Sequence, residues 1–121
     1  MSDKPYVAVV DDDDAVRDAL ANLVEALGYR VRAFPSGLAF LDSHWAAATR
    51  CLIADVQMPG MTGVELMDRL TRDGFEIPTI LVTAHPLEAT RLKAMRGGAI
   101  DYLAKPIRHE ALVACLERAV P

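Results

Sequence analysis

The stretch Tyr6-Val-Ala-Val-Val-Asp-Asp-Asp-Asp-Ala15 places four consecutive aspartates directly after five apolar residues. The apolar run has the length of a short buried strand. From Ala15 onward, apolar residues recur at helical spacing as far as Leu27, and Gly28 follows as a helix stop. The stretch therefore predicts a strand that ends on acids and leads at once into a helix.

Strand-like and helix-like segments alternate in the same way along the rest of the chain. Thr62 and Glu65 have the spacing of a capping box, so a helix should begin there, and Gly74 should end it. Five strands alternating with five helices predict an α/β fold with a parallel sheet and right-handed crossovers. The expected strands are 6–10, 30–34, 51–54, 79–82 and 100–103; the expected helices are 15–27, 37–48, 62–73, 87–96 and a fifth after Pro106 that buries Leu112, Cys115, Leu116 and Ala119.

The polarity of the strands predicts their order in the sheet. The first, third and fourth strands are nearly continuous apolar runs, as expected where helices cover both faces. The second strand carries Arg30 and Arg32, and the short fifth strand carries Asp101, so these two belong at the edges. The order 2-1-3-4-5 satisfies this pattern and predicts a doubly wound, five-stranded fold with helices on both faces.

The composition fits one domain over residues 1–121. Hydrophobic residues make up 52% and charged residues 25% of the chain, and the net charge of −4 argues against general nucleic-acid binding. We find no apolar signal-peptide core and no run long enough to span a membrane. Cys51 and Cys115 lack metal-site spacing, so we expect buried free thiols in a reducing, cytoplasmic setting.

Polar residues follow the carboxyl ends of four predicted strands. In a parallel sheet these ends share one rim, and ligands bind there at the switch point between the first and third strands. We therefore expect one cluster made of Asp11, Asp12, Asp55, Thr83, Ala84 and Lys105.

This residue set points to a metal and a phosphoryl group. Adjacent carboxylates repel one another, and a divalent cation removes the conflict. Oxygen ligands without Cys or His favour Mg²⁺, Mn²⁺ or Ca²⁺ over zinc. Thr83 can donate to a phosphoryl oxygen, and Lys105 can pair with its charge. Asp55 lies between the metal ligands and this pair, which makes it the best-placed nucleophile for a phosphoryl group.

Four motifs in this chain are similar to one known family. They resemble the receiver domain of two-component response regulators, a CheY-like family with a flavodoxin-like (βα)5 fold. The resemblance covers the whole chain and is greatest to receivers of the FixJ or NtrC kind, which usually precede a DNA-binding output domain. The motifs are Val9-Val10-Asp11-Asp12, Asp55-Val-Gln-Met-Pro-Gly-Met-Thr-Gly63, Val82-Thr83-Ala84 and Gly98-Ala-Ile-Asp-Tyr-Leu-Ala-Lys-Pro106.

The resemblance implies a metal-dependent phosphorylation site. Asp55 would accept a phosphoryl group from the phosphohistidine of a sensor histidine kinase or phosphotransfer protein. Asp12, Asp55 and the backbone carbonyl of Gln57 would hold Mg²⁺, for which Mn²⁺ can substitute. Asp11 would act largely through a metal-bound water.

The resemblance also implies a switch. Thr83, with Ala84 beside it, and Lys105 would hold the phosphoryl oxygens, and Tyr102 would swing inward behind Thr83. This would reshape the face made of the fourth helix, fifth strand and fifth helix, where a phosphorylation-dependent homodimer is plausible. Gln57 and His85 occupy positions that tune the rate of phosphoryl loss in the family.

Several residues also have purely structural interpretations. Asp13 and Asp14 fit an N-cap and a first-turn acid of the following helix. Tyr102 fits a packed strand aromatic as well as a switch. Trp45 fits a packing anchor, and His85 an ordinary loop residue. His44 and His109 fit solvent-exposed positions. The basic residues Lys93, Arg96 and Arg108 fit either a solvated face or a dimer or partner face.

The fourth predicted helix has the weakest apolar stripe, made of Ala89 and Leu92 with Met95 to one side. Few buried contacts imply low local stability, and a marginal helix beside the site could serve as the bistable element of a switch. This remains a hypothesis from the sequence.

The function predicted from these residues is a signalling switch and not a turnover enzyme, with only weak self-phosphorylation and self-dephosphorylation. Three alternatives are open. An interaction module without phosphorylation would not need intact Asp55, Thr83 and Lys105. An aspartyl-phosphate phosphohydrolase would need an acid where Gln57 stands. A flavodoxin-like flavin protein would have its cofactor phosphate repelled by the aspartates after the first strand. Contact with DNA is expected only through an output domain that this chain lacks.

Overall fold

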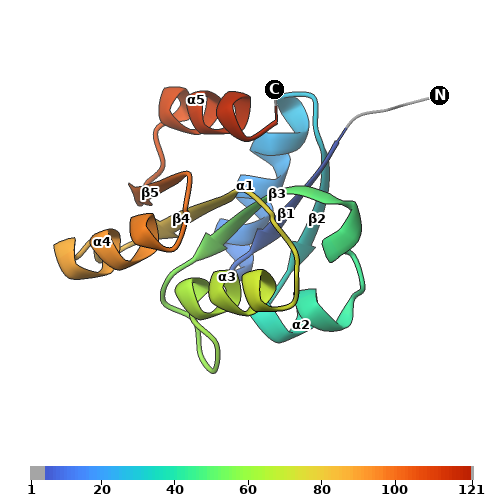
Figure 1. Ribbon diagram of the computed structural model, residues 1–121. Coiled ribbons are helices and arrows are strands. Elements are labelled where there is room, and N and C mark those ends of the chain that lie inside the picture. Colours follow the sequence, from blue (N-terminus) through green and yellow to red (C-terminus); the bar gives the residue numbers. More distant parts are fainter. Residues whose placement is uncertain (1–4, 121) are drawn as a thin grey trace.

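Five parallel strands form the centre of the protein in the computed structural model, which describes residues 5–120 (Figure 1). Their order is β2-β1-β3-β4-β5, so the predicted doubly wound order is confirmed. The strands are β1 Tyr6–Val10, β2 Arg30–Phe34, β3 Thr49–Asp55, β4 Thr79–Thr83 and β5 Asp101–Ala104.

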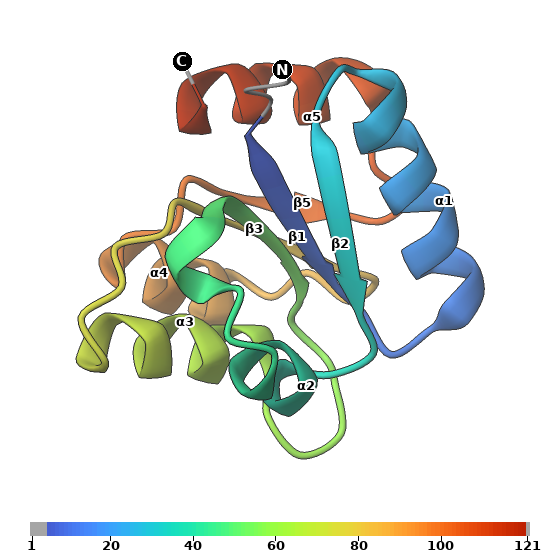
Figure 2. The ribbon, with the colours of Figure 1, turned by 90° about the vertical axis from the view of Figure 1, so that its right-hand side faces the viewer.

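Helices cover both faces of this sheet. Figure 2 shows α1 and α5 on one side of the strands and α2, α3 and α4 on the other. Within residues 5–120, no helix has both the length and the apolar character that crossing a membrane requires. The helices are α1 Asp14–Ala26, α2 Gly37–Asp42, the short 3-10 helix η1 Ala46–Ala48, α3 Gly63–Arg72, α4 Glu88–Arg96 and α5 His109–Ala119.

The alternation of side chains along the strands creates two hydrophobic cores. In β1, Val7 and Val9 pack in the core under α1 and α5, whereas Ala8 and Val10 pack in the core under α2 and α3. All four residues are buried, which explains why a central strand reads as one continuous apolar run. The predicted buried face of α5 is confirmed, and both cysteines are buried free thiols.

The edge strand β2 keeps its two arginines at the surface, where they cover aromatic rings. The Arg32 guanidinium lies 4.3 Å from the centre of the Trp45 ring, and the Arg30 guanidinium lies 3.9 Å from that of Tyr6. The Tyr6 and Trp45 rings meet edge to face at 4.8 Å. Trp45 is therefore a packing anchor, as predicted, and it packs against the core that also contains Phe40 of α2.

The second helix is shorter than the sequence predicted. It ends at Asp42 instead of Ala48, because the Ser43 hydroxyl donates to the Phe40 carbonyl and His44 adopts a left-handed backbone with φ 63°. The chain then forms η1, and β3 begins at Thr49, two residues before the predicted start. The predicted capping box of Thr62 and Glu65 is present at α3.

The predicted apolar stripe of α4 is wrong. Ala89 and Leu92 face solvent, with Leu92 40% and Met95 38% exposed, and Ala94 is the buried residue of this helix. The helix packs on the sheet through Ala94, whose small side chain allows a close approach. Among the described α-helices, the 3-10 helix η1 aside, α4 buries the fewest residues, so its predicted weak packing is confirmed.

Candidate functional site

Three carboxylates meet at the rim of the sheet. Asp11 directly follows β1 and Asp55 ends β3, and these two strands are neighbours with Val10 opposite Ala54. One carboxylate oxygen from each of Asp11, Asp12 and Asp55 lies within 4.8 Å of the others. Asp11 is 1% and Asp55 6% exposed, whereas Asp12 is open to solvent. The juxtaposition predicted from the strand order is present.

Lys105 connects two of these acids. Its Nζ donates to Asp11 Oδ2 at 2.9 Å and to Asp55 Oδ2 at 3.1 Å. Its backbone N–H donates to the Thr83 carbonyl at 2.8 Å, which fixes Lys105 at the end of β5 beside β4. Burial alone would lower the pKa of the lysine, but the hydrogen bonds to both carboxylates outweigh it and raise the pKa above its usual value.

Burial makes the ionised form of Asp55 less favourable than that of a free aspartate. Burial is the largest influence and raises its pKa, and the Asp11 charge acts in the same direction. Hydrogen bonds from Lys105 and from the Gln57 backbone N–H, at 3.1 Å to Oδ1, oppose this effect without cancelling it. A second cation at this rim would favour the ionised carboxylate.

Hydrogen bonds to the side chains of Asp11 and Asp13 and to the Asp11 carbonyl fix the loop after β1. Asp13 caps α1 by accepting from the Val16 N–H at 3.1 Å, so its predicted structural role is confirmed. Asp11 Oδ1 accepts from the Asp13 N–H at 2.9 Å, and Arg17 donates to the Asp11 carbonyl at 2.8 Å. Sequence reasoning missed Arg17, although a basic residue one turn into a helix after an acidic loop is a usable signal.

Thr83 ends β4 and is fully buried. Its hydroxyl donates to Gln57 Oε1 at 2.6 Å and accepts from the His85 N–H at 3.0 Å. The sequence predicted Thr83 at this rim but gave no indication of its side-chain contact with Gln57. Ala84 and His85 are exposed and continue the loop toward α4.

Tyr102 is packed in the same core as Ala8 and Val10, which α2, α3 and α4 cover. It is 9% exposed, and its hydroxyl accepts from the Leu87 N–H at 3.3 Å. The interpretation as a packed aromatic is therefore confirmed, while the switching role stays a prediction. The contact joins β5 to the residue that precedes α4.

Gly63 sets how closely α3 approaches the end of β3. Its N–H donates to the Val56 carbonyl at 3.2 Å, and Val56 donates to Val82 of β4 at 2.9 Å. A Cβ atom at Gly63 would lie 2.4 Å from the Asp55 carbonyl oxygen. Sequence reasoning gave Gly63 only a place in a loop motif, although a glycine directly after a capping threonine signals such a close approach.

Comparison with known proteins identifies the family of this chain. The family model "Response regulator receiver domain" matches residues 7–117. The chain belongs to this family. Two curated relatives of the receiver domain are the response regulator protein TmoT of Ectopseudomonas mendocina, 40% identical over 121 residues, and the transcriptional regulatory protein FixJ of Bradyrhizobium diazoefficiens, 36% identical over 120 residues. Each alignment covers 99% of this chain but only 55% of TmoT and 58% of FixJ, so the receiver domain spans about half the length of these relatives.

Solved structures place the receiver domain in the same fold. The response regulator StyR matches with a TM-score of 0.89 and 39% identity, over 97% of this chain and 59% of StyR. The crystal structure of FixJ-N matches with a TM-score of 0.85 and 36% identity, over 98% of this chain and 94% of that one. The predicted resemblance to FixJ-type receivers is confirmed.

The acidic cluster of this receiver domain has the chemistry of a hard-cation site. The clustered ligands are carboxylates, with neither a histidine nor a cysteine among them in the described residues. Buried Asp11 and Asp55 share a single lysine, so the three acids keep an excess of negative charge beside it. Exposed Asp12 leaves the cluster open to an entering ion. These features favour Mg²⁺, Mn²⁺ or Ca²⁺ over zinc.

The raised pKa of Asp55 predicts that Asp55→Asn stabilises the metal-free receiver domain at pH 7. A raised pKa means that the folded state binds the proton more tightly than the unfolded chain. The resulting contribution to stability is present below the ordinary pKa of 3.8 and is lost as the pH rises through the raised value. Urea unfolding without Mg²⁺ should show the advantage of the variant over the native chain growing between pH 4 and pH 7.

Asp14→Asn is the matched control, because the Asp14 side chain is 85% exposed. An advantage of Asp55→Asn that does not change with pH, or that equals the effect of Asp14→Asn, would contradict this prediction. Adding Mg²⁺ at pH 7 should stabilise the native chain more than Asp55→Asn, because the variant lacks one anionic ligand.

Proposed function

We propose that this receiver domain accepts a phosphoryl group on Asp55 in a Mg²⁺-dependent reaction and acts as a switch in two-component signal transduction. The observation that carries the proposal is the position of Lys105, whose Nζ contacts Asp11 and Asp55 at 2.9 and 3.1 Å beside the exposed acid Asp12. A nucleophilic carboxylate, a fixed ammonium and spare acidic ligands form a site for one anionic phosphoryl group and one cation.

The residues that would hold Mg²⁺ are Asp11, Asp12, Asp55 and the backbone carbonyl of Gln57, and Mn²⁺ could take its place. The bound ion would neutralise charge on the incoming phosphoryl group. Asp12 is exposed and could bind the ion first, whereas Asp11 is anchored by the Asp13 N–H and faces Lys105. Gln57 follows Asp55 by two residues, and its N–H already fixes Asp55 Oδ1.

Asp55 would act as the nucleophile. One carboxylate oxygen forms a bond to phosphorus, and the phosphorus–nitrogen bond of a donor phosphohistidine breaks with its electron pair moving to the imidazole. The Lys105 ammonium would pair with the negative charge of one phosphoryl oxygen, and the Thr83 hydroxyl would donate a hydrogen bond to a second one. The lysine and the cation would keep Asp55 ionised against the effect of its burial.

The downstream part of the proposal is a change on the surface made by α4, β5 and α5. Tyr102 of β5 holds the Leu87 N–H before α4, and α4 itself buries only Ala94, so this region has few contacts to lose. A sensor histidine kinase would supply the phosphoryl group, and an output domain or a second receiver domain would detect the changed surface. Relatives named as transcriptional regulatory proteins support an output that regulates transcription.

A switch fits this site better than a hydrolase does. An aspartyl-phosphate hydrolase needs a general acid two residues after its nucleophile. Here that residue is Gln57, an amide that accepts a hydrogen bond from Thr83. The site therefore supports slow loss of the phosphoryl group and not turnover.

Mass spectrometry after incubation with acetyl phosphate and Mg²⁺ tests the proposal. We expect the native chain to gain one phosphoryl group, Asp55→Asn to gain none, and EDTA to prevent the gain. Asp14→Asn removes an exposed acid of α1 and should be phosphorylated like the native chain. Equal labelling of Asp55→Asn, or no labelling of the native chain, would overturn the proposed function.

A further inference from the structure

The hydroxyl of Thr83 is already committed in this structure. A threonine hydroxyl has one proton to donate, and here it goes to Gln57 Oε1 at 2.6 Å. The Thr83 oxygen also accepts from the His85 N–H at 3.0 Å. Because Thr83 is 0% exposed, it has no contact with bulk water that could replace these partners. Thr83 cannot donate to Gln57 and to a phosphoryl oxygen at the same time.

We propose that Gln57 is a positioning residue that restrains Thr83 in the unphosphorylated state. The inference rests on the proposed function, because it concerns how the same site is regulated. The hydrogen bond from Thr83 Oγ1 to Gln57 Oε1, here called the Gln57 latch, must open before Thr83 can donate to a phosphoryl group on Asp55. The latch thus competes directly with the phosphorylated state.

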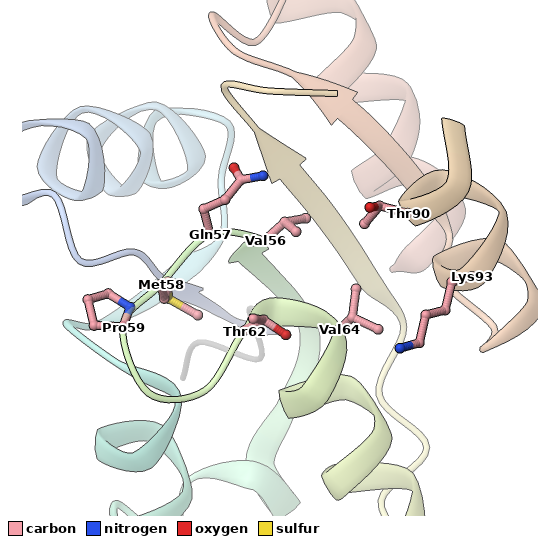
Figure 3. A pocket seen from close by; sticks show the side chains of 8 residues that line it. All are labelled: Val56, Gln57, Met58, Pro59, Thr62, Val64, Thr90 and Lys93. Carbon is pink, nitrogen blue, oxygen red and sulfur yellow. The ribbon is translucent and has the colours of Figure 1, made fainter. Parts of the chain in front are cut away.

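The surroundings of Gln57 allow the latch to open. Its side chain is exposed and lines a cavity of about 590 Å³ between the β3–α3 loop and α4 (Figure 3). Thr62 and Val64 line this cavity from the α3 side, and Thr90 and Lys93 line it from α4. A released Gln57 amide can therefore remain hydrated in this space, and no buried polar group is left without a partner.

The latch also connects the site to the loop before α4. Thr83 Oγ1 holds the His85 N–H, and Leu87, two residues later, is held by the Tyr102 hydroxyl. A hydroxyl that turns from Gln57 toward Asp55 changes the acceptor geometry offered to His85. The short segment between Thr83 and α4 is thus tied to the latch at one end and to Tyr102 at the other.

The expected effect follows from the strength of one neutral hydrogen bond. Removing the Gln57 acceptor should favour the state in which Thr83 faces the phosphoryl group by about two- to tenfold. Gln57→Met keeps a side chain of similar length but offers only a weak sulfur acceptor. The backbone carbonyl of residue 57 is unchanged in this variant.

The experiment is a double-mutant cycle on binding of beryllofluoride, a stable mimic of the phosphoryl group, in the presence of Mg²⁺. The affinity of the native chain, Gln57→Met, Thr83→Ala and the double variant is measured from the backbone amide NMR signals of residues 83–85 and Leu87; Pro86 has no amide proton. We expect Gln57→Met to bind about two- to tenfold more tightly than the native chain. In the Thr83→Ala background the same substitution should change the affinity by less than about twofold, because the hydroxyl that it releases is missing.

The outcomes separate this inference from the proposed function. An unchanged or weaker affinity of Gln57→Met, or the same gain with and without the Thr83 hydroxyl, overturns the latch while native binding still supports the phosphorylation site. Failure of the folded native chain to bind beryllofluoride overturns the proposed function and the latch together. Thermal unfolding of each variant tests whether Thr83→Ala is folded. If it is not, Thr83→Val replaces it in the cycle.

Discussion

Lys105→Met is expected to lower the free energy of unfolding by about 3 kcal/mol at pH 7 in the absence of Mg²⁺. Lys105 Nζ is the hydrogen-bonding cation between Asp11 and Asp55, which are 1% and 6% exposed. The substitution keeps most of the apolar stem but leaves two buried carboxylates without their partner. Removing one partner from a buried ion pair costs more than the pair itself contributes.

Two conditions should restore part of the stability that the Lys105→Met variant loses. Mg²⁺ should stabilise it more than the native chain, because the cation replaces the lost positive charge and no lysine competes for the acids. Lowering the pH should also help, because the pKa of Asp55 is already raised by burial and rises further without the lysine. A raised carboxyl pKa contributes stability at low pH that is lost as the pH increases.

Urea unfolding with and without Mg²⁺ measures these effects. Lys93→Met is the matched control, because Lys93 is an exposed lysine on α4, and it should change stability by less than about 0.5 kcal/mol. The explanation is wrong if Lys105→Met unfolds at the same urea concentration as the native chain, or if Mg²⁺ stabilises both equally.

The position of the acidic cluster could be predicted because it depends on strand order and little else. Arg30, Arg32 and Asp101 marked the two edge strands, and the strand order then made the first and third strands neighbours. Once these strands are parallel and adjacent, Asp11 and Asp55 must end on the same rim. The sequence also placed Lys105 on this rim, at the end of the fifth strand, but its contacts with both acids are seen only in the structure.

The side-chain details of the site could not be predicted in this way. The bond between Thr83 and Gln57 joins residues 26 positions apart, and it depends on rotamers that only the packed structure selects. The burial of Tyr102 has the same origin, because a strand aromatic can point into the core or out of it. The sequence therefore located the rim but not the hydrogen bonds that control it.

The errors in the helices also have physical causes. The sequence pattern predicts helix as far as Ala48. In the structure the Ser43 hydroxyl donates a hydrogen bond to the Phe40 carbonyl, and His44 takes a left-handed backbone conformation. Neither feature alters the spacing of apolar residues from which the helix was predicted. In α4 the apolar residues are not spaced to form one clear helical face, and the spacing of Ala89 and Leu92 predicts a buried stripe that the structure does not have. The structure instead buries Ala94 and leaves the equally small Ala89 in solvent, so side-chain type alone could not identify the buried face.

Gly63→Ala is expected to destabilise the protein by about 2–3 kcal/mol, against the direction that helix propensity predicts. Gly63 is the first residue of α3, where alanine should be favoured over glycine by about 1 kcal/mol. A Cβ atom there would lie 2.4 Å from the Asp55 carbonyl oxygen and 3.0 Å from Leu81 Cδ2. The carbonyl belongs to the backbone of β3 and cannot rotate away, so either α3 or the end of β3 must move.

A displaced β3 end would also move the Asp55 side chain away from Lys105, so we expect weaker beryllofluoride binding together with the lower stability. Gly97→Ala is the matched control. Its Cβ atom would approach Met67 Cε at 2.8 Å, and this methyl group can turn aside because it ends a flexible side chain. Urea unfolding of both variants decides the matter, since propensity alone predicts a stabilised Gly63→Ala protein. A stability equal to or above that of the native chain would mean that α3 can shift freely, and Gly63 would then have no part in holding Asp55 in place.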